Sequence, residues 1–160
     1  MTAHSTKTAA AAIANNRKAL REYVILERCE AGIQLRGSEV KSARAGKVDL
    51  GTGFAIAQKD GLYLYDVNIA IYEQASQLNH APKRPRRLLL HKREMRDLIS
   101  NAEQKGLTIV PLKMYFKRGW AKVELGLCKG KKTGDKREIL RKKTADREVA
   151  RAVAAATHRK

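Results

Sequence analysis

The stretch LTIVPLKMYFKRGWAKVELGLC, residues 107–128, decides the fold class. Apolar residues alternate with polar or charged ones on both sides of Arg118-Gly119. A period of two predicts two antiparallel strands, 107–116 and 120–128, joined by a tight turn. In the first strand, one face is expected to hold Thr108, Val110, Leu112, Met114 and Phe116.

The opposite face of that first strand carries Lys113, Tyr115 and Lys117. This face is therefore expected to point outward, with Tyr115 exposed between two lysines. On the second strand, Val123, Leu125 and Leu127 are expected to point inward, which turns Lys122 outward.

Shorter β-type runs precede this hairpin. Residues 23–27 and 31–36 read as a hairpin or bulged pair separated by Arg28-Cys29-Glu30. Residues 54–58 and 62–65 flank Lys59-Asp60-Gly61, and Asp-Gly between two β runs is a strong hairpin signal. Residues 68–72 are expected to continue the sheet.

Two helices and one loop complete the expected body. Ser38 can cap a short helix that stops at Gly46, and residues 91–105 have helical spacing before Gly106. Residues 79–87 contain two prolines and several cations, which predicts a basic loop. The predicted fold class is mainly β: a small antiparallel oligonucleotide-binding-like β-barrel with one long and one short flanking helix, plus a basic C-terminal tail.

The charge balance favours an anionic partner. The chain of 160 residues has 34 Lys and Arg against 16 Asp and Glu, a formal net charge of +18, and RNA is the expected partner. No apolar run approaches the roughly 20 residues that a membrane span needs. No secretory signal is recognised, and the isolated Cys29 and Cys128 suit a reducing cytoplasm, where both are expected as small buried hydrophobic residues.

The sequence contains no recognisable motif of catalytic, metal-binding or cofactor-binding residues. The four histidines, His4, His80, His91 and His158, lack metal-ligand spacing and are expected to meet solvent or phosphate. The chain is therefore expected not to be an enzyme and to need no cofactor. From the residues alone, an RNA-binding module of the translation apparatus is favoured, with a basic ribosomal protein and an RNA-modifying enzyme as alternatives.

The charge pattern also divides the chain. From Lys129 onward there are 12 Lys and Arg against 4 Asp and Glu, with little apolar material. We expect a disordered leader at 1–14, an RNA-binding β-barrel domain at 15–130, and a basic tail at 131–160. That tail is expected to be disordered when free and helical when bound to the ribosome.

Several ordered blocks of sequence resemble the SmpB family, the SsrA-binding proteins of bacterial trans-translation. They are Asn16-Arg17-Lys18-Ala19, Tyr23, residues 30–33, residues 37–47 (GSEVKSARAGK), Asn79-His80, residues 88–91 (LLLH), residues 110–112, Gly126-Leu127, residues 130–132 and Asp135-Lys136-Arg137. The resemblance covers about residues 15 to 151.

This resemblance implies a non-catalytic protein that binds the tRNA-like domain of tmRNA and delivers it to stalled ribosomes. The tmRNA-binding face would comprise Asn16, Tyr23, Glu30, Leu89, His91 and Lys122. The ribosome-binding tail would comprise Lys131, Lys132, Asp135, Lys136 and Arg137. This tail would enter the mRNA channel and the vacant decoding centre, where it would meet small-subunit rRNA. Elongation factor Tu would be an indirect partner through alanyl-tmRNA, and no membrane partner is implied.

Overall fold

The computed structural model describes residues 11–75, 79–132 and 144–151. The chain forms two compact units, Met1–Lys129 and Gly130–Lys160. The elements of the first unit, with the last strand ending at the boundary, are β1 Ala12–Asn15, α1 Arg17–Glu22, β2 Tyr23–Ile33, α2 Gly37–Arg44, β3 Val48–Asp49, β4 Phe54–Gln58, β5 Gly61–Tyr65, β6 Asn68–Ile69, β7 Arg86–Leu89, α3 Lys92–Lys105, β8 Thr108–Lys117 and β9 Trp120–Gly130. Residues 144–151 of the second unit are helical and exposed.

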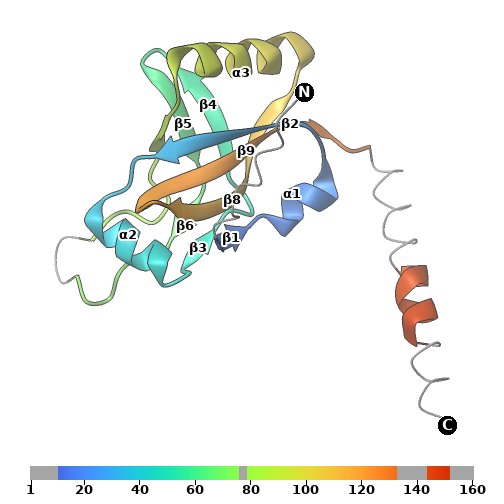
Figure 1. Ribbon diagram of the computed structural model, residues 1–160, viewed down its shortest axis with the longest axis horizontal. Helices are drawn as coiled ribbons and strands as arrows, with labels where there is room; N and C mark the ends of the chain where they lie inside the picture. Colours follow the sequence, from blue (N-terminus) through green and yellow to red (C-terminus); the bar gives the residue numbers. More distant parts are fainter. Residues whose placement is uncertain (1–10, 76–78, 133–143, 152–160) are drawn as a thin grey trace. The chain divides into compact units, whose positions relative to one another are not determined.

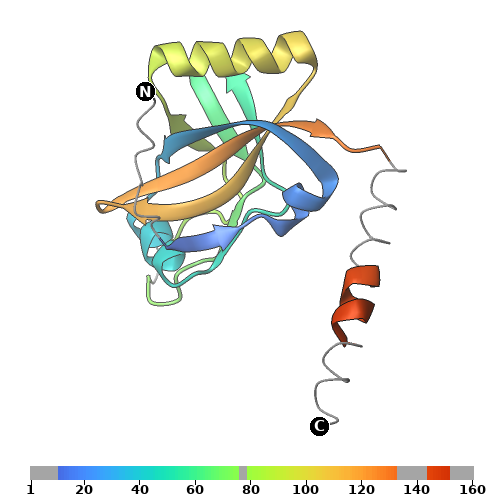
Figure 2. The same ribbon diagram turned by 45° about the vertical axis from the view of Figure 1, so that its right-hand side comes forward.

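Six strands form a closed ring in the first unit. The strand order β8-β4-β5-β7-β2-β9 is closed by the pairing of β8 with β9, and β1 adds to β8 (Figure 1). The pairings with recorded registers are antiparallel, which confirms the predicted mainly β, antiparallel fold. The helix α3 lies across one end of the ring, as both ribbon views show (Figure 2).

The hairpin of β8 and β9 follows the prediction at its turn and on its second strand. Arg118 and Gly119 both have positive φ, 52° and 78°, the geometry of a tight two-residue hairpin turn. Val123, Leu125 and Leu127 are at most 2% exposed in the main core. The inward face of β9 was therefore predicted correctly.

A β-bulge changes the facing of β8. The register with β9 shifts between Pro111 and Lys113. Consequently Ile109 and Met114 pack in the main core, while Val110 and Leu112 join a second cluster with Ala19 of α1. The predicted single apolar face was wrong because a bulge inserts one residue into a period of two.

The expected exposure of Tyr115 was also wrong. Its side chain is 8% exposed. The hydroxyl donates to Glu30 of β2, and the Lys113 amine lies 5.7 Å from the ring centroid. Polar neighbours therefore cover an aromatic ring that faces away from the core.

Other elements differ from the sequence-based prediction in position. Tyr23–Ile33 is one strand of 11 residues, so no hairpin forms at Arg28-Cys29-Glu30. Only Asn68–Ile69 of the run 68–72 is a strand, and it pairs with β3 in a separate small sheet. The strand β1 and the helix α1 were not predicted. The first three residues of β1, Ala12–Ala14, fall in the range expected for the leader, whose residues 1–10 lie outside the described residues.

Both predicted helices are present. The helix α3 begins after His91 and ends at Gly106, whose φ of 60° and ψ of 41° form a left-handed cap. The helix α2 is capped at Arg36 rather than at Ser38. The Ser38 hydroxyl instead lies 2.9 Å from Nδ1 of His80.

The basic loop is anchored by a buried ionic cluster that sequence reasoning missed. Glu39 and Arg86 are fully buried, with Arg86 Nε 2.9 Å from Glu39 Oε1. Arg84 adds a contact of 2.5 Å from its Nη2 to Glu39 Oε2. Burial alone would raise the pKa of Glu39, but hydrogen bonds from Arg84 and the Arg36 backbone, together with the Arg86 charge, lower it. Residues 79–87 are thus a connector tied to α2, and their last two residues already belong to β7.

Candidate nucleic-acid interface

An open, polar cleft of about 880 Å³ lies where the middle of β2, the end of β7 and the start of α3 meet. Its lining residues are Arg28, Cys29, Glu30, Asp60, Gly61, Arg87, Leu88, Leu89, Leu90, His91, Lys92, Glu94, Met95 and Lys122. Four of the six residues expected on the tmRNA-binding face, Glu30, Leu89, His91 and Lys122, lie in this cleft. They come from β2, β7, the cap of α3 and β9.

The strand β7 presents Leu89 by simple alternation. Arg86 and Leu88 point inward and are buried, whereas Arg87 and Leu89 point outward, with Leu89 51% exposed. Gly32 pairs with Leu89, and a Cβ atom on Gly32 would lie 3.1 Å from the Leu89 Cβ. A glycine on β2 therefore leaves room for an apolar side chain at the cleft.

Glu30 is held as an ionised acceptor. The Tyr115 hydroxyl donates to its Oε2, and the Lys117 amine lies 3.1 Å from its Oε1. The hydrogen bond from Tyr115 is the main reason why the pKa of Glu30 is lowered, and the Lys117 amine adds to the effect. An ionised, oriented carboxylate can accept hydrogen bonds from a ribose 2′-hydroxyl or the donor edge of a base.

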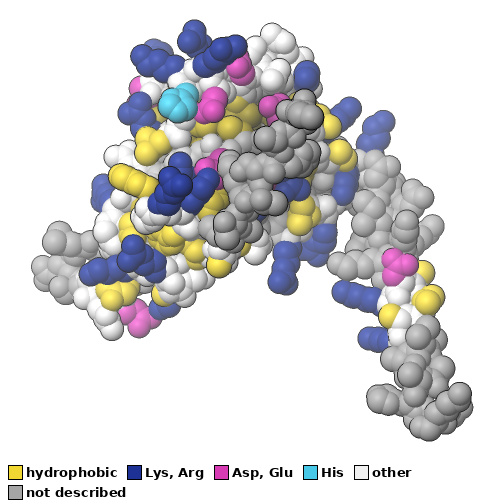
Figure 3. All heavy atoms as spheres, viewed as in Figure 1, with side chains coloured by type: hydrophobic (Ala, Val, Ile, Leu, Met, Phe, Trp, Pro, Cys, Tyr) yellow, Lys and Arg dark blue, Asp and Glu magenta, His cyan; other side chains and the backbone are white. Residues whose placement is uncertain are grey.

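The cleft mixes cations with carboxylates. The Arg87 Nη2 donates to the Asp60 carbonyl at 2.8 Å, and Arg28 pairs with Glu124 at 3.1 Å, so both guanidinium groups have defined positions. Figure 3 shows Lys and Arg side chains, in dark blue, spread over the side of the molecule that faces the viewer. Arginine and lysine supply phosphate contacts, while the carboxylates restrict which neighbouring groups fit.

No sequence signal identified Arg87 at the cleft. The run Arg86-Arg87-Leu88-Leu89 places two polar residues before two apolar ones, so the alternate burial of this strand is not visible in the sequence as a period of two. The two prolines and the density of charge led instead to the prediction of a loop. The sequence around Arg28 likewise gave no sign that this residue lies at the cleft.

Asn16 lies in the interior rather than at a surface. It is 2% exposed, and its Nδ2 donates to the carbonyls of Leu50 and Pro111, each at 2.9 Å. Its Oδ1 accepts from the Ala19 amide, which caps α1. These contacts give Asn16 a structural role in fixing α1 against β8.

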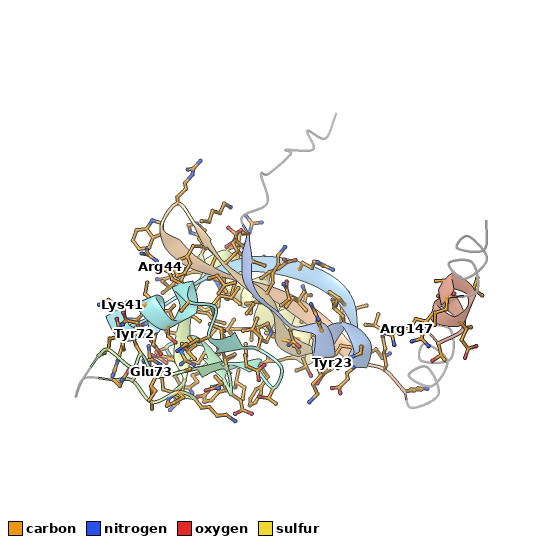
Figure 4. The ribbon with its side chains drawn as sticks, turned by 90° about the horizontal axis from the view of Figure 1, so that it is seen from below. Tyr23, Lys41, Arg44, Tyr72, Glu73 and Arg147 are labelled. Atoms are coloured by element: carbon orange, nitrogen blue, oxygen red, sulfur yellow. The ribbon has the colours of Figure 1, made fainter. Side chains whose placement is uncertain are left out.

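Tyr23 lies at a different surface from the cleft. It is half-buried at the junction of α1 and β2, beside a smaller hollow of about 280 Å³ that Lys18, Thr52 and Phe54 also line. Figure 4 shows it far along the body from Lys41, Arg44 and Tyr72, which gather around α2. The six expected residues therefore divide into four in the cleft, one at a second hollow and one in the interior.

His80 lies in the interior. It is 3% exposed, with Nε2 2.9 Å from the Ile69 carbonyl, so the expected contact with solvent or phosphate is wrong. Cys128 is buried as expected, whereas Cys29 is partly exposed in the cleft. Lys131 and Lys132 follow β9, whereas Asp135, Lys136 and Arg137 lie outside the described residues, as do His4 and His158.

The described ranges contain neither a metal-binding cluster nor a membrane-spanning helix. Within residues 11–75, 79–132 and 144–151, no group of three or more His, Cys, Asp or Glu side chains could hold a metal ion. No helix in the same part of the chain is long and apolar enough to cross a membrane.

A sequence model described as SmpB protein matches residues 13–155. The chain belongs to the SmpB family. It is 54% identical over 143 residues to the SsrA-binding protein of Carboxydothermus hydrogenoformans, covering 89% of this chain and 96% of the relative. The SsrA-binding protein of Synechocystis sp. is 55% identical over 142 residues, covering 88% and 92% of the two chains.

A solved SmpB structure is also similar. It is described as "tmRNA-SmpB: a journey to the center of the bacterial ribosome", with a TM-score of 0.64 and 56% sequence identity, covering 75% of this chain and 85% of that one. The expected SmpB resemblance is thus confirmed by sequence and by fold.

Proposed function

We propose that this chain binds the tRNA-like domain of tmRNA (SsrA RNA) and delivers it to stalled ribosomes for trans-translation. Membership of the SmpB family supports the proposal. One observation carries it: Glu30, Leu89, His91 and Lys122 come from separate elements and still converge on one polar cleft. Phosphate, ribose and an unpaired base are the groups that such a mixed lining accommodates.

Each cleft residue has a separate part in the proposed complex. Lys122 contacts a phosphate, the Glu30 carboxylate accepts hydrogen bonds from a ribose hydroxyl or a base, and Leu89 packs on a sugar or base face. His91, exposed at the cap of α3, adds a hydrogen bond. Tyr23 extends the interface at the second hollow. Asn16 contributes by positioning α1.

The tail has the second part in the proposal. Lys131, Lys132, Asp135, Lys136 and Arg137 enter the vacant decoding centre and the mRNA channel, where small-subunit rRNA provides the phosphates. Elongation factor Tu takes part only indirectly, through alanyl-tmRNA. The protein supplies shape and charge, requires neither catalysis nor a cofactor, and works in the cytoplasm.

Sequencing of the RNA that co-purifies with the full chain tests the proposal. One structured tmRNA should dominate, and the protein should be substoichiometric to ribosomes. A stoichiometric match to one ribosomal subunit would instead identify a ribosomal protein. Turnover of an RNA substrate by the purified chain would identify an RNA-modifying enzyme.

A further inference from the structure

Trp120 is a large aromatic side chain with no partner among the described residues. It is 72% exposed, at the start of β9 directly after the turn. The other aromatic side chains of the first unit have contacts: Phe54 stacks on Tyr65, Phe116 lies under Arg44, and the hydroxyls of Tyr63 and Tyr72 bond to nearby side chains. An unpartnered indole at this exposure suggests a surface that another molecule covers.

The register of the hairpin places Trp120 on the same face as the cleft residues. Tyr115 pairs with Lys122, and Lys117 pairs with Trp120. Directly opposite residues of an antiparallel pair share one face, with Cβ atoms about 5 Å apart. Because Tyr115 and Lys117 both contact Glu30, the indole stands one residue pair beyond the cleft, next to Lys122.

The charge around the indole decides the kind of partner. Residues 113–122 include four Lys or Arg. Lys113 pairs with Glu124 and Lys117 with Glu30, whereas no ion pair among the described residues involves Arg118 or Lys122, the two cations nearest to the indole in sequence. Protein–protein interfaces are depleted in lysine, whereas single-stranded nucleic acid is bound by aromatic rings set among cations. The tight turn at Arg118 and Gly119 sets the position of the backbone from which the ring projects.

We propose that Trp120 stacks on an unpaired base of the bound tmRNA, on a nucleotide adjacent to the one in the cleft. The inference rests on the proposed function and adds a contact that the cleft itself does not contain. Lys122 neutralises a phosphate beside that base, while Lys117 keeps its contact with Glu30. The hairpin β8–β9 is thereby an arm of the RNA interface.

The chain contains a single tryptophan, so its fluorescence reports on this residue alone. A transcript of tmRNA is titrated into the full chain while filter binding measures complex formation independently. Tryptophan emission should be quenched in proportion to complex, and acrylamide should quench the remaining emission less efficiently. Unchanged emission at full complex formation would overturn the stacking proposal and leave the proposed function standing.

Substitutions of Trp120 distinguish a loss of base stacking from a loss of folding. Trp120→Gln should bind tmRNA roughly 5- to 150-fold more weakly, and Trp120→Phe, which retains a stacking ring, much closer to wild type. Ile71→Gln, another exposed apolar residue at 48% exposure, should bind normally. All three should melt like wild type.

Two further outcomes would overturn the proposal. Wild-type affinity of Trp120→Gln for tmRNA, combined with a loss of peptide tagging, would show that the indole contacts the ribosome. If the wild-type chain binds no tmRNA at all, the proposed function fails together with the inference.

Discussion

Glu30 and Lys122 provide the most direct test of the cleft at the scale of single residues. Glu30→Ala and Lys122→Ala should each weaken tmRNA binding by about 1.5 to 3 kcal/mol, since each removes a hydrogen bond to a charged group. Neither residue is in the core, so both variants should fold. Lys122→Ala should melt like wild type, whereas Glu30→Ala also loses the contacts with Tyr115 and Lys117 and should melt at a somewhat lower temperature. Filter binding and melting curves measure the two effects.

Lys105→Ala is the matched control for Lys122→Ala. It removes the same charge from the exposed end of α3, outside the cleft lining. Normal binding by both folded cleft variants would mean that the RNA face has been assigned to the wrong surface.

The hydrogen bond from the Tyr115 hydroxyl should be the main cause of the lowered pKa of Glu30. Because the hydroxyl donates to the carboxylate, Tyr115→Phe should move the pKa of Glu30 upward toward its ordinary value. A carboxyl whose folded-state pKa is lowered stabilises the protein above its unfolded-state pKa, and this stabilisation is lost as the pH falls through the folded-state pKa. The variant should lose about 1 kcal/mol of stability at pH 7 and less at pH 3, which lies below the unfolded-state pKa of a glutamate.

Carbon-13 NMR titration of the glutamate carboxyls, with urea unfolding at both pH values, measures this effect. An unchanged titration of Glu30 in the Tyr115→Phe variant would exclude the hydroxyl as its cause.

The junction between α2 and the chain before β7 depends on Glu39. Glu39→Gln leaves the fully buried Arg86 without its countercharge, so the free energy of unfolding should fall by about 3 to 5 kcal/mol. Glu73→Gln is the control, since its pair with Lys47 is exposed and should contribute at most about 1 kcal/mol. Equal urea midpoints for the two variants would contradict the role of the buried cluster.

Elements were predicted well where local signals are strong. The turn at Arg118-Gly119, the helix ending at Gly106 and the Asp60-Gly61 hairpin follow from residues adjacent in sequence. Pro111 inside a β run is a local signal for the bulge that the prediction of a strict period of two did not use. The pairing of Arg86 with Glu39 depends on a neighbour far along the chain, and no local pattern encodes it. For the same reason, the sequence could not show that Asn16 points inward whereas Glu30 and Lys122 share a cleft.

At the scale of the whole molecule, the body and the tail should be separable. A chain truncated before Lys131 retains every described cleft residue, so tmRNA binding should remain nearly intact. Peptide tagging on stalled ribosomes should be abolished, because the basic tail is missing. Filter binding and a reconstituted tagging assay measure the two activities. Tagging by the truncated chain would refute this division of labour, and lost tmRNA binding would assign the tail to the RNA complex.

The pairing of β2 with β9 has a consequence for biosynthesis. The ring joins a strand that begins at Tyr23 to one that ends at Gly130, so it cannot close until nearly the whole body has been translated. Such non-local pairing is slow to form, and chains are made at about 5 to 20 residues per second. The nascent body therefore reaches its native state only after Gly130 has been translated, when β9 becomes available to both β2 and β8.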